Sequence, residues 1–201
     1  NKLWAVSYYR CKIERDTNTK NCFSKTQFEN TMKNYRSPRF LSAGACKSVF
    51  RVIYKDNERQ LEQALSIIDI EDLRKRSMDL CIQKEIEVSL MCSVLSQLRI
   101  CPNSLRIHSV FRSCHPPPRR SWRHSSCFEG VGLYQYVRME YCSSGDLEGI
   151  LRERKALSAD MTRYVMFQMC FALYACRDVL SMRHYDIKLL NFLCSSWDTM
   201  L

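Results

Sequence analysis

The chain has 201 residues, a formal net charge of +10, and 46% hydrophobic and 11% aromatic residues. This composition excludes an intrinsically disordered chain and supplies enough apolar material for one sizeable core or two small lobes. No apolar run reaches the roughly 18 residues of a membrane-spanning helix, so we expect no membrane segment. The positive charges are scattered along the chain, which is typical of a solvated basic surface.

The twelve cysteines do not form the pattern of a disulfide framework. Several lie in apolar stretches with helical spacing, where cysteine behaves as a small hydrophobe, and no Cys-x-x-Cys pair occurs. We therefore expect free thiols and an intracellular, cytoplasmic location. A zinc site built from Cys114, His115, His124 and Cys127 is disfavoured by the three prolines between them and by the unusual ligand spacing.

The first part of the chain is predicted to end in a β-hairpin. Residues 1–36 carry no interpretable motif, so we treat them as an N-terminal extension of unknown role. Between 40 and 54 apolar residues occur at both alternating sets of positions, which predicts a strand buried on two faces. A polar turn at 55–58 leads to a returning apolar strand at 64–68.

A long helix and two more strands follow the hairpin. Apolar residues recur at steps of three and four between Ile82 and Leu98, and Pro102 ends the helix. Strands are predicted at 105–111 and 133–139. The loop at 112–130 between them is rich in proline, arginine and serine, and is long enough to be an insertion.

The last third of the chain is predicted to be mainly helical. A short helix is expected at 146–154, and a second long helix runs from an N-cap at Ser158 to about residue 180. Strands with one helix, followed mostly by helices, predict an α+β arrangement in two parts.

The segment from His184 to Leu193 is the most informative motif. Its acid, Asp186, can orient or deprotonate an attacking hydroxyl, and Lys188 can neutralise charge on a moving phosphoryl group. The side-chain oxygen of Asn191 can hold a magnesium ion. The order H-x-D-x-K-x-x-N resembles the catalytic loop of eukaryotic protein kinases, and its D-x-K-x-x-N form is more similar to the serine/threonine type.

The resemblance to protein kinases extends upstream to Leu41. The stretch 41–49, with Gly44, resembles the glycine-rich loop whose backbone amides approach nucleotide phosphates. The strand at 64–68 resembles the one that carries the phosphate-binding lysine, but Ser66 occupies the lysine position. Lys47 stands where the third glycine is usual, as in the with-no-lysine kinases, so we expect it to supply the missing charge.

The long helix of this family carries a glutamate that pairs with the phosphate-binding lysine. We assign this role to Glu87, because the apolar spacing that follows it matches the family. Glu85 is the alternative, since it fits the distance from the preceding strand slightly better.

The stretch 136–146 resembles the connection between the two kinase lobes. The resemblance implies a gatekeeper at Met139, adenine contacts from the backbones of Glu140 and Cys142, and ribose contacts from Asp146. An adenine site is a largely apolar cleft with few polar contacts. The residues implied to sandwich the ring are Val49, Ala64 and Leu193.

The resemblance implies a kinase-like two-lobe α+β fold. Residues 37–142 would form a complete, small, β-rich N-lobe with its hinge, and residues 143–201 the beginning of a helical C-lobe. The implied activity is transfer of the γ-phosphoryl group of ATP, with Mg2+, to a serine or threonine hydroxyl of a protein substrate. The metal-binding Asp-Phe-Gly triplet is not reached by Leu201, so we expect residues 1–201 alone to be inactive.

Two alternatives remain. Ser66, the sparse glycine loop, and Tyr185 in place of the arginine that pairs with a phosphorylated activation loop favour a pseudokinase that acts as a protein-binding scaffold. The intact set of Asp186, Lys188 and Asn191 opposes it. A nucleic-acid-binding module acting through the basic stretch at 112–124 is disfavoured, because arginines cluster only there.

Overall fold

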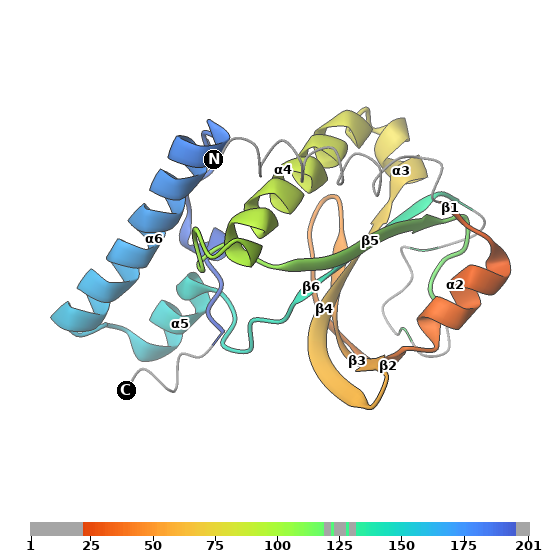
Figure 1. Ribbon diagram of the computed structural model, residues 1–201, viewed down its shortest axis with the longest axis horizontal. Coiled ribbons are helices and arrows are strands. Elements are labelled where there is room, and N and C mark those ends of the chain that lie inside the picture. The colour runs from red at the N-terminus through yellow and green to blue at the C-terminus, as the bar shows by residue number, and fades with distance from the viewer. Residues whose placement is uncertain (1–21, 119–121, 123–127, 129–131, 196–201) are drawn as a thin grey trace.

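The chain forms an α+β structure, as the sequence predicts. It is built around one mixed, six-stranded sheet. The computed structural model describes residues 22–118, 122, 128 and 132–195. Every neighbouring pair of strands is antiparallel except β1 and β5, which are parallel. In spatial order the strands are β1 (Cys22–Phe23), β5 (Ile107–Ser113), β6 (Tyr134–Glu140), β4 (Arg59–Asp69), β3 (Ser48–Asp56) and β2 (Tyr35–Ala43) (Figure 1).

Five α-helices accompany the sheet within the described residues. They are α2 (Lys25–Met32), α3 (Ile70–Lys75), α4 (Asp79–Gln97), α5 (Leu147–Arg154) and α6 (Ala159–Leu180). The predicted hairpin, the long helix α4, the two later strands and the two C-terminal helices are all confirmed. The predicted N-cap at Ser158 is also present, since its Oγ accepts a hydrogen bond from Met161 N at 3.2 Å.

Strand β4 lies inside the sheet, between β3 and β6. Its side chains alternate between two covered faces, so a continuous run from Gln63 to Ile68 is buried. The β3–β4 hairpin closes with Asp56 opposite Arg59, which leaves a two-residue turn. Asn57 begins that turn at φ 51°, a left-handed conformation that asparagine tolerates well.

One face of the sheet packs into an aromatic core. Phe50 and Leu65 are completely buried there, under Phe28 from α2. The loop between β5 and β6 also contributes, because Trp122 packs edge-on against Phe50 with ring centroids 5.0 Å apart. Phe128, from the same loop, is 2% exposed. The predicted insertion at 112–130 therefore supplies core side chains at the two described positions beyond 118.

The opposite face of the sheet is covered by α3 and α4. Ile82 and Ile86 of α4 pack against Ile68 and Val137 of the sheet, as the predicted apolar stripe requires. The buried hydroxyl Oγ of Ser93 accepts a hydrogen bond from Ile107 N at 2.8 Å, which fixes α4 against the first residue of β5.

Helices α5 and α6 lie at one end of the sheet, beside the C-terminal end of α4 (Figure 1). Cys101 and Leu95 pack against Ala175 and Cys176 of α6, and Asn103 Nδ2 donates to Gln168 Oε1 at 2.6 Å. The outer side of α6 stays open, with Phe167 67% exposed. Among the described residues we find no helix with the length and apolarity needed to cross a bilayer.

The predicted boundary between an extension and the first lobe, at residues 36 and 37, falls inside β2. Residues 22–36 also contribute β1, α2 and the buried side chains of Phe28 and Met32. This part of the extension is therefore built into the sheet and its aromatic core. The rest of the extension, residues 1–21, lies outside the described residues.

Two leucines of β4 test the burial pattern with one substitution. Leu65 is fully buried, and we expect Leu65→Ala to lower the free energy of unfolding by about 2–5 kcal/mol through lost contacts and a residual cavity. Leu61 is 43% exposed, so Leu61→Ala should cost less than about 1 kcal/mol. Urea unfolding of both variants measures the difference, and equal losses would contradict the change from exposed to buried positions along β4.

Candidate functional site

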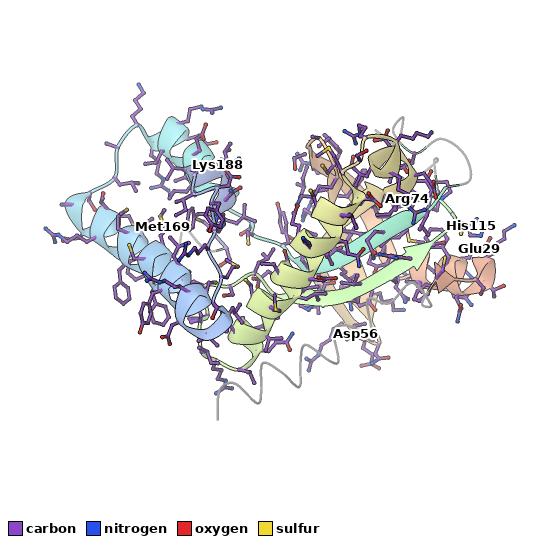
Figure 2. All side chains as sticks on the ribbon, turned by 90° about the horizontal axis from the view of Figure 1, so that it is seen from above. Glu29, Asp56, Arg74, His115, Met169 and Lys188 are labelled. Atoms are coloured by element: carbon purple, nitrogen blue, oxygen red, sulfur yellow. The ribbon has the colours of Figure 1, made fainter. Side chains whose placement is uncertain are left out.

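The three residues predicted to transfer a phosphoryl group lie together after α6. The helix ends at Ser181, and a 3-10 turn at Leu189–Asn191 brings Asn191 back to Asp186. Asn191 Nδ2 donates to the backbone oxygen of Asp186 at 2.8 Å and to its Oδ2 at 3.2 Å. Lys188 Nζ lies 2.9 Å from the same carboxylate oxygen. This cluster belongs to the helical part of the molecule, where Figure 2 shows Lys188.

The cluster keeps the Asp186 carboxyl ionised. The hydrogen bond from Lys188 lowers the pKa of Asp186 most, and the hydrogen bond from Asn191 lowers it further. Both the aspartate and the lysine side chains are at least half exposed, at 63% and 50%. Solvent therefore screens the ion pair, and its effect is to orient the carboxylate more than to stabilise the fold.

A short backbone pairing joins the end of this loop to the segment that leaves the sheet. Asp146 and Leu193 form an isolated antiparallel bridge. On either side of it, Leu147 N donates to Phe192 O at 2.9 Å and Cys194 N donates to Gly145 O at 2.8 Å. The residues predicted to contact the ribose and the adenine, Asp146 and Leu193, are thus brought side by side.

The connecting segment turns at a glycine with positive φ. Gly145 has φ +75°, a conformation that glycine adopts without cost, and it turns the chain into α5. Asp146 then caps that helix, since its Oδ1 accepts from Gly149 N at 2.8 Å. Cys142 N–H donates to no other described residue, while burial and the charge of Glu140 raise the pKa of the Cys142 thiol to about 11.

The residues predicted to line the adenine site share one face of the sheet. Cross-strand register places Val49 opposite Ser66, and Ala64 opposite Met139. Directly opposite residues point to the same side, and this is the side that α4 covers. Met139 packs against that cluster, while Ala64 is 6% exposed.

The loop between β2 and β3 carries the predicted phosphate-binding groups. Gly44 N donates to Lys47 O at 2.9 Å, which closes the turn. A methyl group built on Gly44 would meet no atom within 4 Å, so this loop has open space around its backbone. Leu41, on β2, is 40% exposed at the same end of the sheet.

Lys47 is paired with the helix, but with Glu85 instead of the preferred Glu87. Lys47 Nζ lies 2.5 Å from Glu85 Oε1. Glu87 instead accepts a weak hydrogen bond from Gln83 at 3.4 Å. Residues two apart on a helix differ by about 200°, so only one of the two glutamates can face the hairpin once Ile86 is buried against the sheet.

Ser66 is a buried polar residue without a partner. Its side chain is on the face that carries Val49, and the residue is 2% exposed. Among the described residues, Ser66 Oγ is a buried atom with no hydrogen bond. Such an atom costs about 1–3 kcal/mol unless something satisfies it, so this position marks a place where a ligand or water is needed.

An arginine that the sequence analysis did not single out lies on the same face. Arg51 is opposite Ala64, forms an ion pair with Glu62, and lies over the ring of Tyr141 at 5.6 Å. Alternate residues of a strand lie on one face, so the position of Val49 also places Arg51 on this face. This alternation could have identified Arg51 from the sequence. It adds a positive charge beside the connection between sheet and helices.

The oxygen donors of the cluster suit magnesium in kind. Asn191 donates to Asp186 through Nδ2, so its Oδ1 can act as a metal ligand beside the carboxylate. Hard divalent cations prefer such oxygens. The described residues hold no group of three or more histidine, cysteine or acidic side chains around one point. A magnesium ion here would therefore draw further ligands from phosphate oxygens and water.

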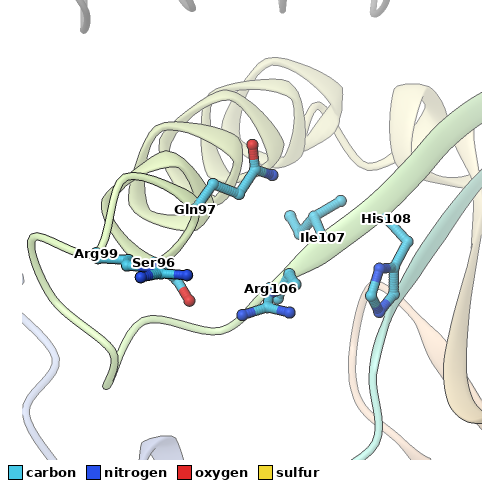
Figure 3. A pocket seen from close by; sticks show the side chains of 6 residues that line it. All are labelled: Ser96, Gln97, Arg99, Arg106, Ile107 and His108. Atoms are coloured by element: carbon cyan, nitrogen blue, oxygen red, sulfur yellow. The ribbon is translucent and has the colours of Figure 1, made fainter.

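An open hollow of the described surface lies away from this site. It encloses about 450 Å³ between the C-terminal end of α4 and the start of β5 (Figure 3). It is lined by Ser96, Gln97, Arg99, Arg106, Ile107 and His108. None of these residues was predicted to take part in catalysis or nucleotide binding.

Comparison with known proteins adds no assignment, since neither a family model nor a curated protein matches this chain.

The order of the two hydrogen bonds to Asp186 can be measured. We expect Lys188→Met to raise the pKa of Asp186 towards its ordinary value, because it removes the largest cause of the depression. Asn191→Ala should raise the pKa by a smaller amount. Carboxyl-carbon NMR titration of both variants reads the pKa directly, and a larger effect of the asparagine would contradict this geometry.

Proposed function

We propose that this chain carries the nucleotide-binding lobe and the catalytic loop of a protein kinase of the serine/threonine type. The observation that carries the proposal is the cluster of Asp186, Lys188 and Asn191, held by a backbone bridge against the segment that leaves the sheet. Phosphoryl transfer needs an acid, a cation and a metal-binding oxygen held beside the nucleotide, and this cluster supports the proposal by supplying all three.

The adenine would lie against the sheet face of Val49, Ala64 and Met139, with Leu193 on its other side. The N–H of Cys142 and the backbone of Glu140 would bond its polar edge, and Cys142 N–H has no other described partner. Asp146 retains one carboxylate oxygen after capping α5, and that oxygen can accept from a ribose hydroxyl.

Lys47 would supply the positive charge that Ser66 lacks. Lys47 precedes Val49 by two residues, and alternate residues of an extended chain lie on the same face. It therefore extends from the face on which Ser66 is buried. The ion pair with Glu85 of α4 holds its ammonium group over that face. Lysine–phosphate contacts are charge-assisted and stronger than neutral hydrogen bonds, so one well-placed lysine can replace another.

The contacts of Lys188 and Asn191 with the Asp186 carboxylate suit it to orientation of the attacking hydroxyl. These contacts lower the pKa of Asp186, and a carboxylate with a lowered pKa is a weaker base. It accepts a hydrogen bond well and removes a proton poorly. Lys188 would stabilise charge on the transferred group. Asn191 would hold Mg2+, and a bound Mg2+ would neutralise negative charge on the phosphate oxygens.

A catalytically inactive scaffold of the same shape is the second candidate. The specific observation in its favour is the buried, unpartnered Ser66 Oγ at the position where this family has its lysine. The exposed Tyr185, at 86%, likewise stands where the family has arginine. This candidate requires a folded chain that does not bind MgATP.

Nucleotide binding by the chain separates the two candidates. We expect MgATP to bind, and Lys47→Met to weaken binding by at least about tenfold, because a charge-assisted phosphate contact is lost. Isothermal titration calorimetry with a non-hydrolysable ATP analogue measures both. Lys55→Met is the matched control, since this exposed lysine lies at the far end of β3.

The two glutamates of α4 provide a second control. Glu85→Gln should weaken MgATP binding by a smaller factor than Lys47→Met, because Lys47 loses its anchor and keeps its charge. Glu87→Gln should leave binding unchanged. Unaltered binding by Lys47→Met would refute its assigned role, and absence of MgATP binding by the folded wild-type chain would favour the scaffold.

A further inference from the structure

The hollow between α4 and β5 gathers positive charge, and none of its six lining side chains is acidic. Two arginines and a histidine line it, together with the hydrogen-bonding side chains of Ser96 and Gln97. Arg99 comes from the turn that ends α4, and Arg106 and His108 from the start of β5 (Figure 3). Among the described residues, neither guanidinium has an acidic partner, and no acidic side chain lines the hollow.

The frame that carries these side chains is rigid. Two hydrogen bonds join the backbone of Arg106 to Glu140. Arg106 N donates to Glu140 Oε1 at 2.8 Å, and Glu140 N donates to Arg106 O at 2.9 Å. On the other side, Gln97 Nε2 and Ile107 N both donate to Ser93 Oγ. These hydrogen bonds join the start of β5, beside Arg106, to the last turns of α4, which precede Arg99.

The charge of the hollow comes from the two arginines. Partial burial and the charges of Arg138 and Arg106 lower the pKa of His108, which favours the neutral imidazole with its one N–H donor. Two guanidinium groups from different elements line one space. That donor geometry matches the tetrahedral oxygens of a phosphate better than a single ammonium group would.

We propose that this hollow is a phosphate-binding site, separate from the candidate nucleotide site and independent of the proposed function. Its ligand carries a phosphate monoester that Arg99 and Arg106 bind together, with Gln97 and His108 completing the donors. Arg99, Arg106 and His108 are all exposed, so a phosphate attached to a passing peptide can reach them as readily as a free phosphate ion can.

Fluorescence anisotropy with a labelled peptide bearing one phosphoserine tests this site. We expect the peptide to bind the wild-type chain, and inorganic phosphate to displace it. Arg99→Gln with Arg106→Gln should weaken binding by at least about tenfold, as loss of charge-assisted contacts requires. The matched control is Arg36→Gln with Arg39→Gln, which removes the same charge from exposed positions on β2, the opposite edge strand.

A second variant keeps the test independent of the arginine substitutions. Gln97→Glu changes one exposed amide and places an acid in the hollow, and we expect a comparable loss of affinity. A phosphopeptide that binds at least tenfold more tightly than inorganic phosphate identifies a phosphorylated protein as the source, and equal affinities identify free phosphate. Equal losses in both double variants, or equal binding of the unphosphorylated peptide, would overturn the site.

Discussion

The register of β4 is the constraint on which the rest of the structure depends. This strand is hydrogen-bonded to β3 on one side and β6 on the other, and both of its faces are covered. Leu65 and Ile67 point into the aromatic core, while Ala64 and Ser66 point towards α4. A slip of one residue would exchange these sets, burying Ser66 among aromatic rings and moving the candidate adenine face to the wrong side.

Function in this account comes from the joining of two differently built parts. The sheet supplies a rigid apolar face and one exposed lysine anchored by α4. The helical part supplies a polar loop whose three chemical groups bond one another and remain exposed to solvent. The backbone bridge between Asp146 and Leu193 ties the loop to the segment that leaves the sheet, and Phe192 packs beside it against Leu147 and Ile150.

The elements with strong periodicity were predictable from sequence. The two-sided apolar pattern of the hairpin reflects burial on both faces of the sheet, and the three- and four-residue steps of α4 reflect burial of one helix face against it. The cluster around Asp186 was predictable as well, because its residues are close in sequence. By contrast, α2 is short and buries only Phe28 and Met32, so its apolar signal is weak. Its capping box, Ser24 with Gln27, was the readable signal.

Long-range choices were not predictable. The pairing of Lys47 with Glu85 depends on how α4 rotates over the sheet, which sequence spacing along the helix does not fix. Trp122 and Phe128 lie in a stretch of polar, proline-rich composition, and only the tertiary fold shows that they complete the aromatic core. The hollow at Arg99 and Arg106 likewise brings together two basic residues that the sequence separates by a turn.

The central claim is that the sheet face and the catalytic loop bind one nucleotide together. Amide chemical-shift mapping by NMR during titration with Mg2+ and a non-hydrolysable ATP analogue tests it most directly. The account requires simultaneous shifts at residues 44–49, 139–142 and 186–193, with one shared dissociation constant. Shifts confined to one of these segments, or found only at the hollow beside β5, would contradict it.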